Sequence, residues 1–375
     1  MRIEYDNKKD IEDILNLPYT SNYTIDKEGS SNKLFYGDNF DALNIMINEL
    51  DLSGKIDLVY IDPPFSSNNI FKIGEKSNTI SSSNDDAIAY TDTLKDEEYL
   101  EFIRERLVLL HKLLSDKGSI YFHIDYKIGH YIKIILDGIF GSENFRGDIS
   151  RIKCNPKNFK RKGYGNIKDM ILFYSKTDDY IWNFPTVPFT EEDIARLYKK
   201  IDENGRRYTT VPVHAPGETK NGDTSDMWKG MYPPKGRHWR CSPKELDKLD
   251  KANLIEWSKK GNPRKKIYAD DMKKKGKLMQ DIWEYKDPSC PKYPTEKNIE
   301  MVKKIILSSS NPESTILDCF CGSGTTVIAA QELGRNWIGV DKSEKSIEII
   351  KNRLNNVKKG LYDYNKSYEF ITIGK

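Results

Sequence analysis

Hydrophobic positions along the chain follow two periods, one typical of helices and one typical of buried strands. The clearest helix is expected over residues 96–114, where apolar side chains recur every three or four positions before Gly118. Continuous apolar and β-branched runs predict strands buried on both faces. The expected strands are 33–39, 55–61, 119–125, 149–154, 170–175, 315–320, 336–341 and 368–373, and the other helices are 9–16, 42–50, 130–140, 297–308, 325–333 and 344–356. This alternation predicts an α/β fold with a doubly wound, mostly parallel sheet.

The regular pattern is interrupted by one long segment. Between residues 184 and 290, prolines, glycines, tryptophans and lysines replace the apolar periodicity, and only short helices are expected, at 191–199 and 243–252. The sequence therefore predicts an α/β domain in two parts, residues 1–183 and 291–375, with residues 184–290 as an inserted domain of different role.

The composition is that of a protein without membrane segments. No apolar run approaches membrane-spanning length, and the start Met1-Arg2-Ile3-Glu4-Tyr5 lacks an apolar signal core. The 5 cysteines form no paired C-x-x-C framework. They predict reduced thiols in a cytoplasmic protein, and neither a zinc site nor a disulfide scaffold.

Positive charge is concentrated locally, although the formal net charge of +3 is nearly balanced. Residues 151–168 carry Lys and Arg side chains but no acid, and residues 259–277 are again rich in lysine. Such patches on a near-neutral chain fit a phosphate-binding face. Solvated lysine-rich loops give the same pattern, and charge alone favours that plainer interpretation.

The first candidate site is the turn Asp62-Pro63-Pro64-Phe65. The two prolines fix φ and remove two backbone donors, so the strand before them ends there. The turn presents a carboxylate, carbonyl oxygens and an aromatic ring, a set suited to holding a flat ring that carries an amino group. Residues 66–84, rich in Ser, Asn and Gly, are expected to form a mobile loop over this site.

The second candidate site is Asp318-Cys319-Phe320-Cys321-Gly322-Ser323-Gly324-Thr325, where a strand leads through small residues into a helix. Small residues let a ligand approach the backbone, and a helix N-terminus offers free N–H groups. Asp341 ends the next strand, where a carboxylate suits ribose hydroxyls. Because the third glycine of a dinucleotide site is missing, we expect a nucleoside cofactor without a diphosphate. A purely structural turn explains the glycines alone, but Asp341 argues against it.

Together these motifs resemble the amino-methyltransferases that modify exocyclic nitrogens of DNA bases with S-adenosylmethionine. That family has a catalytic Asp-Pro-Pro-Tyr/Phe motif and a cofactor motif Asp-x-Phe-x-Gly-x-Gly-Thr. Here the catalytic motif comes first, which is the circularly permuted order of the β group, where modification subunits of restriction systems belong. Further similar stretches cover residues 36–39, 118–125, 140–145, 280–283 and 293–297. The resemblance implies a Rossmann-like methyltransferase sheet with residues 184–290 as a target-recognition domain.

The resemblance also implies roles for individual residues. Asp62 and the carbonyl of Pro63 would accept the two amino hydrogens of adenine, with Pro64 completing the turn and Phe65 stacking on a flipped-out base. The expected cofactor-binding residues are Asp38, Asn39, Thr295, Lys297, Asp318, Phe320, Cys321, Gly322, Ser323, Gly324, Thr325 and Asp341. No metal site is expected.

Three positions depart from the family pattern. Cys319 stands where proline is commonest, Asn298 replaces the usual proline after Thr-x-Lys, and Phe65 replaces the commoner tyrosine. The partners that the resemblance implies are double-stranded DNA, a second copy of the chain in a homodimer and a cognate restriction endonuclease, with no membrane.

Several alternatives stay open at this point. Asp62 favours adenine N6, because the N4-cytosine group usually has Ser-Pro-Pro at this turn. Methylation of an RNA base or a protein amide, where Asn-Pro-Pro is typical, is a second alternative, and a non-catalytic DNA-binding subunit is a third. His123 and Asp125 are expected to be structural. Core packing is expected more than base stacking for Trp228, Trp239, Trp257 and Trp283.

Overall fold

A computed structural model of the protein describes residues 3–26, 29–64, 96–156, 158, 160, 162–219, 222–288, 296–357 and 367–374, and the backbone of β4 (Ile70–Ile73) and β5 (Ala87–Thr91). The chain divides into two compact units, residues 1–183 with 280–375 and residues 184–279. The sequence placed the end of the inserted segment at residue 290. The second unit ends earlier because β17 (Ile282–Glu284) pairs in parallel with β7 (Phe145–Ile152) of the first unit.

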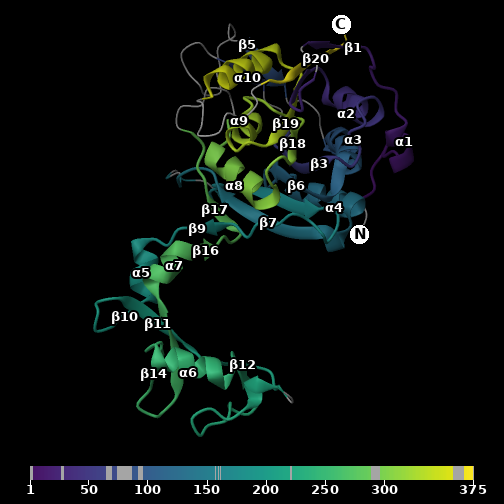
Figure 1. The fold of residues 1–375 in the computed structure, drawn as a ribbon. Coiled ribbons are helices and arrows are strands. Elements are labelled where there is room, and N and C mark those ends of the chain that lie inside the picture. The colour runs from purple at the N-terminus through teal and green to yellow at the C-terminus, as the bar shows by residue number, and fades with distance from the viewer. Residues whose placement is uncertain are drawn as a thin grey trace. The chain divides into compact units, whose positions relative to one another are not determined.

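The first unit is built on a 10-stranded sheet (Figure 1). Its order is β1 (Tyr23–Asp26), β20 (Glu369–Ile373), β2 (Lys33–Tyr36), β19 (Asn336–Asp341), β18 (Thr315–Asp318), β3 (Ile56–Ile61), β6 (Leu114–Ile124), β8 (Lys168–Ser175), β7 and β17. All neighbours from β20 to β6 run parallel, whereas β1 is antiparallel to β20, and β8 is antiparallel to both β6 and β7. The predicted α/β fold with a doubly wound, mostly parallel sheet is confirmed.

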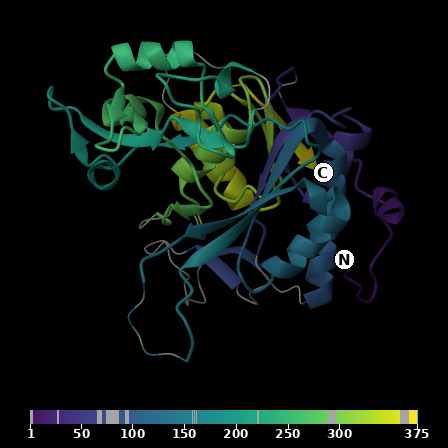
Figure 2. The same ribbon diagram turned by 90° about the horizontal axis from the view of Figure 1, so that it is seen from below.

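Helices cover both faces of this sheet. The helices of the first unit are α1 (Ile11–Leu15), α2 (Asn39–Asn48), α3 (Asp96–Leu113), α4 (Gly129–Phe140), α8 (Ile299–Ser309), α9 (Thr325–Glu332) and α10 (Glu344–Asn356). Helices α1 to α4 contact one another on one side, and α8 to α10 contact one another on the other side (Figures 1 and 2). Within the described residues, no helix combines the length and apolarity needed to span a bilayer.

The alternation of side chains along the strands divides the core between these two faces. Val59 and Ile61 of β3 belong to a large buried cluster with the apolar sides of α2, α3 and α4. Helix α8 contacts β3 and β6, and α9 contacts β18 and β19. Each fully buried apolar side chain contributes about 1.5–3 kcal/mol, so both faces hold the strand ends in place.

The second unit is smaller and mostly antiparallel. It has a 4-stranded sheet in the order β10 (Lys200–Ile201), β11 (Arg207–Pro212), β15 (Pro263–Tyr268) and β14 (Ile255–Trp257). Two strand pairs, β12 (His214–Pro216) with β13 (Arg237–Trp239) and β9 (Thr186–Val187) with β16 (Lys277–Leu278), and the helices α5 (Glu191–Leu197), α6 (Pro243–Lys251) and α7 (Ala269–Lys275) complete it.

The tryptophans of the inserted segment are mostly core residues, as expected. Trp228 and Trp239 are each 2% exposed and form a small cluster with Leu246 and Ile255. Trp257 differs, since it is 39% exposed and stacks on the ring of Trp228 at a centroid distance of 5.3 Å. Trp283, in the first unit, is also buried.

Candidate active site

The predicted site residues follow four neighbouring parallel strands. Asp318 ends β18, which pairs with β3 on one side and with β19 on the other. Asp341 ends β19 and pairs with Tyr36 of β2. Because parallel strands end at the same edge of a sheet, the turns after β2, β3, β18 and β19 lie together there. The fold thereby brings Asp38, Asp62, Asp318 and Asp341 to one edge, although they are far apart in sequence.

The turn between β18 and α9 is held by its own backbone. The N–H of Cys321 donates to the carbonyl of Val340 at 3.1 Å, and the N–H of Gly324 donates to the carbonyl of Cys321 at 2.8 Å. Gly324 precedes α9 with φ +77°, and a Cβ added there would lie 2.6 Å from Cγ1 of Ile350. Only glycine fits this backbone conformation and this close approach of α10.

Asp341 is bonded to the same turn. Its Oδ2 accepts from the N–H of Gly322 at 2.8 Å, and its Oδ1 accepts from the N–H of Ser343 at 2.8 Å. Burial raises the pKa of Asp341, and these two N–H donors oppose that rise. Next to it, the hydroxyls of Ser323 and Thr325 lie 3.1 Å apart.

Asp318 is the most deeply placed carboxylate of the group, at 3% exposed. Burial raises its pKa to about 7, and the negative charges of Asp62 and Asp341 add to this rise. Hydrogen bonds from the Thr326 hydroxyl and the N–H of Phe320 act in the opposite direction and lower the pKa. The N–H of Phe320 donates to its Oδ1 at 2.9 Å. Because this pKa is close to neutral pH, a cationic ligand nearby would readily change the protonation of the carboxyl group.

Asp38 and Asn39 start α2 beside this turn. Asp38 caps the helix by accepting from the N–H of Phe40 at 2.8 Å. The amide nitrogen of Asn39 donates to the carbonyl of Cys319 at 3.0 Å. Asn39 therefore ties the turn after β2 to the turn after β18.

Asp62 lies directly after β3, and its two carboxylate oxygens have different surroundings. Its Oδ2 forms an ion pair with the ammonium of Lys297. Its Oδ1 is buried, lies 3.9 Å from Nδ1 of His123 and accepts no hydrogen bond from the described residues. Pro63 is buried and Pro64 half-buried beside it. Phe65, Thr295 and the expected loop over residues 66–84 lie outside the described residues, apart from the backbone of β4.

The residue after Lys297 explains one departure from the family pattern. Asn298 is the N-cap of α8, and its side chain accepts from the N–H of Glu300 at 3.0 Å and of Met301 at 3.4 Å. Proline at this position has no such acceptor, so asparagine stabilises the helix start by another route.

His123 continues a buried polar chain behind Asp62. The hydroxyl of Tyr60 lies 2.9 Å from its Nδ1, and Oδ2 of Asp169 lies 3.3 Å from its Nε2. Burial lowers the pKa of His123, so the imidazole is neutral near pH 7. On its far side Asp169 pairs with Lys153 at 2.6 Å and Arg151 at 3.5 Å. Part of the basic run 151–168 therefore neutralises a buried carboxylate and is not available to phosphates.

Comparison with known proteins decides the family. A family model described as DNA methylase matches residues 56–352. The chain belongs to the DNA methylase family. This methylase is 42% identical over 328 residues to the type II methyltransferase M.EcaI of Enterobacter cloacae, a match that covers 86% of this chain and 69% of that protein.

Two more distant relatives extend this picture. The methylase is 28% identical to the type II methyltransferase M.KpnI of Klebsiella pneumoniae, over 82% of this chain and 78% of that protein. It is 25% identical to the Mod subunit of the type III restriction-modification enzyme StyLTI of Salmonella typhimurium, over 84% of this chain and 52% of that subunit. The resemblance inferred from the motifs is confirmed at the level of the family.

Two residues that contact the candidate site were missed by the sequence analysis. Arg106 of α3 donates to Oδ1 of Asn39 at 2.9 Å and to Oδ1 of Asp38 at 3.3 Å. Arg353 of α10 donates to the carbonyl of Ser323 at 3.0 Å and pairs with Glu296 at 2.9 Å. Neither arginine belongs to a recognisable motif, and both lie on amphipathic helices where charged side chains are ordinary, so no sequence signal distinguished them.

Proposed function

We propose that this methylase transfers a methyl group from S-adenosylmethionine to N6 of adenine in double-stranded DNA, as the modification enzyme of a restriction–modification system. The observation that carries the proposal is the position of Asp62 at the end of β3, on the strand next to the glycine turn after β18. Its buried Oδ1, which has no donor among the described residues, is an acceptor suited to an amino hydrogen.

The residues around the glycine turn fit a nucleoside cofactor that carries an amino acid. Gly324 gives the turn before α9 its left-handed conformation, and the nearby carboxylates of Asp318 and Asp341 suit an ammonium group and ribose hydroxyls respectively. Asp38 and Asn39 would contact the adenine of the cofactor, as the family resemblance implies. When bound, the sulfonium of S-adenosylmethionine supplies an electrophilic methyl group.

The role proposed for Asp62 follows from the chemistry of the amino group. In adenine the N6 lone pair is delocalised into the ring, so the nitrogen is a poor nucleophile. Asp62 Oδ1 and the carbonyl of Pro63 would each accept one N6–H, which favours a pyramidal nitrogen with a directed lone pair. With N6 held in this way, the N–C bond would form as the S–C bond breaks in one in-line displacement favoured by positioning and electrostatics. S-adenosylhomocysteine would leave, and the proton lost from N6 would pass to Asp62 or to solvent. Lys297 would hold Asp62 in place from its other oxygen.

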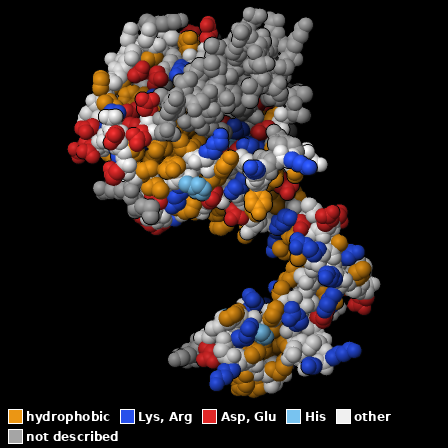
Figure 3. Space-filling model, turned by 180° about the vertical axis from the view of Figure 1, so that it is seen from behind, with side chains coloured by type: hydrophobic (Ala, Val, Ile, Leu, Met, Phe, Trp, Pro, Cys, Tyr) orange, Lys and Arg blue, Asp and Glu red, His pale blue; other side chains and the backbone are white. Residues whose placement is uncertain are grey.

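The second unit, residues 184–279, is proposed to recognise the target sequence. Its surface carries many Lys and Arg side chains (Figure 3), among them the exposed Lys235, Arg237, Arg240 and Lys244. Such side chains would hold DNA phosphates, while a few polar contacts read base edges. A homodimer and a cognate endonuclease are further proposed partners that rest on the family resemblance.

The identity of the base is tested by nucleoside analysis. Unmethylated genomic DNA is incubated with the protein and S-adenosylmethionine, digested to nucleosides and examined by mass spectrometry. We expect N6-methyladenine, and sequencing of the methylated positions then gives the recognition sequence. N4-methylcytosine alone would replace the proposal by its nearest alternative, and unmodified DNA would favour a non-catalytic DNA-binding subunit.

A further inference from the structure

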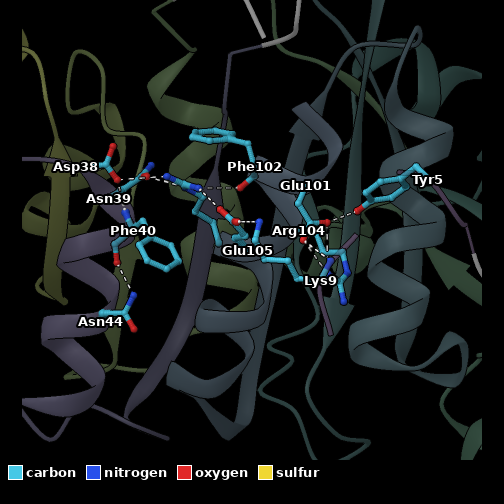
Figure 4. Close-up of polar contacts among 11 residues, drawn as sticks. Tyr5, Lys9, Asp38, Asn39, Phe40, Asn44, Glu101, Phe102, Arg104 and Glu105 are labelled. Carbon is cyan, nitrogen blue, oxygen red and sulfur yellow. Dashed lines mark hydrogen bonds and ion pairs between the residues drawn. The ribbon is translucent and has the colours of Figure 1, made fainter. Parts of the chain in front are cut away.

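Arg106 forms a buried junction between α3 and the start of α2. Its polar partners Asp38, Asn39 and Glu105 are labelled in Figure 4. Its side chain is 8% exposed, and its Nε donates to Oδ1 of Asn39 at 2.9 Å. One terminal nitrogen, Nη2, donates to Oδ1 of Asp38 at 3.3 Å. The other, Nη1, is held by the carbonyl of Phe102 at 3.2 Å and by Glu105 at 3.0 Å. The guanidinium is thus fixed in a single orientation, since it bonds in three directions.

Aromatic rings enclose the same guanidinium. Its central carbon lies 3.8 Å from the ring centroid of Phe102 and 5.4 Å from that of Phe40. Phe102 in turn meets the ring of Phe320, in the turn after β18, at a centroid distance of 6.2 Å in an edge arrangement. Stacking on these rings further limits the freedom of the guanidinium. Arg106 therefore contacts one turn of the candidate cofactor site directly and reaches the other through Phe102.

These contacts fix the orientation of the polar atoms of Asp38 and Asn39. Because Asn39 Oδ1 accepts from Arg106, its amide nitrogen points to the carbonyl of Cys319. Asp38 uses Oδ1 for both Arg106 and the N–H of Phe40, which leaves its Oδ2 unengaged among the described residues. The Asp38 side chain is 43% exposed, so this oxygen is accessible to an amino donor.

We propose that Arg106 is a positioning residue for the cofactor, which fixes Asp38 and Asn39 so that they accept and donate hydrogen bonds at the adenine end of S-adenosylmethionine. The inference rests on the proposed function, because it deepens the assignment of the same site. Arg106 does not touch the reacting atoms. Its loss is expected to weaken cofactor binding and to leave the rate of methyl transfer at saturating cofactor nearly unchanged.

Arg104, two residues earlier on α3, is a matched control. Its side chain is also 8% exposed, and it pairs with Glu101 at 3.1 Å (Figure 4). Glu101 itself accepts from the hydroxyl of Tyr5 and the N–H of Lys9, away from the candidate site. Replacing either arginine removes a buried guanidinium from the same helix, but only Arg106 reaches Asp38 and Asn39.

The experiment compares Arg106→Lys and Arg104→Lys in the full chain by calorimetric binding of S-adenosylmethionine and by steady-state kinetics. We expect Arg106→Lys to weaken cofactor binding and to raise the KM for S-adenosylmethionine by about tenfold or more, because charge-assisted hydrogen bonds of fixed geometry are lost. In Arg106→Lys we expect kcat and the KM for DNA to stay within about twofold of the values of the unchanged protein. In Arg104→Lys all of these constants should stay within the same range.

A second variant keeps the test decisive if Arg106→Lys does not fold. Glu105→Gln removes the charge that holds Nη1 and leaves Asp38, Asn39 and the guanidinium in place, and a selective loss of cofactor affinity is expected because Arg106 is held less firmly. Equal losses in the Arg104 and Arg106 variants, or unchanged cofactor affinity in Glu105→Gln, would overturn the positioning role alone. An unchanged protein that does not bind S-adenosylmethionine would overturn the proposed function and this role together.

Discussion

Because the pKa of Asp318 is raised, we predict that the stability of the protein depends on pH through this carboxyl group. Burial raises its pKa to about 7 from an ordinary value of 3.8, so between these values the folded protein binds one proton more than the unfolded chain. Stability therefore falls as pH rises through this window, and the loss is complete above about pH 7. A difference of about three pKa units corresponds to about 4 kcal/mol. Asparagine has the same shape but does not ionise, so Asp318→Asn removes this penalty.

Urea unfolding of the two proteins across pH measures the effect. Near pH 4 the free energies of unfolding should be similar, because the carboxyl is then neutral in the folded state and an asparagine oxygen still accepts from the N–H of Phe320. The advantage of Asp318→Asn should grow by about 2–3 kcal/mol from about pH 5 to about pH 8. A variant less stable than the original at pH 8, or a difference that does not change with pH, would refute this reasoning.

Two further substitutions test the geometry of the site. Gly324→Ala should lower the free energy of unfolding by about 2–5 kcal/mol, from a strained positive φ and a clash with Ile350, whereas Gly138→Ala on the exposed face of α4 should raise it by about 0.5–1 kcal/mol. Urea titration measures both, and equal effects would contradict the close approach at Gly324. Lys297→Met removes the cation beside Asp62 and should lower kcat by about tenfold or more, while stability falls by about 1–3 kcal/mol. Unchanged turnover in that variant would show that the ion pair has no part in methyl transfer.

The sheet and its glycine turn were predictable from the sequence because local signals agree there. The apolar residues of β3, β18 and β19 indicate buried strands. The prolines Pro63 and Pro64 mark the end of β3, and an aspartate is the last residue of both β18 and β19. The alternation of strands with helices predicts the parallel order of the sheet. This order alone is enough to expect Asp62 and Asp318 at neighbouring strand ends, before any side-chain contact is known.

The remaining features depend on contacts between distant residues. The second unit was read as irregular because its strands are short and pair over long distances, as β11 does with β15. Arg106 looks like any charged residue of an amphipathic helix, and only the packing of α3 against α2 buries it beside Asp38. Likewise, the ion pair between Lys297, which the resemblance assigns to the cofactor, and Asp62 was not foreseen. Side-chain partners of this kind carry no local pattern.

The most direct test of the account is methyl transfer by the protein and by Asp62→Asn, with Asp125→Asn as the control. Asp125 follows the neighbouring strand β6, and its Oδ1 accepts from the N–H of Lys127 at 2.9 Å. With unmethylated DNA and labelled S-adenosylmethionine, we predict N6-methyladenine from the unchanged protein and from Asp125→Asn, and at least a hundredfold lower rate from Asp62→Asn, on the order of a lost transition-state contact. Equal rates in all three proteins would contradict the role of Asp62.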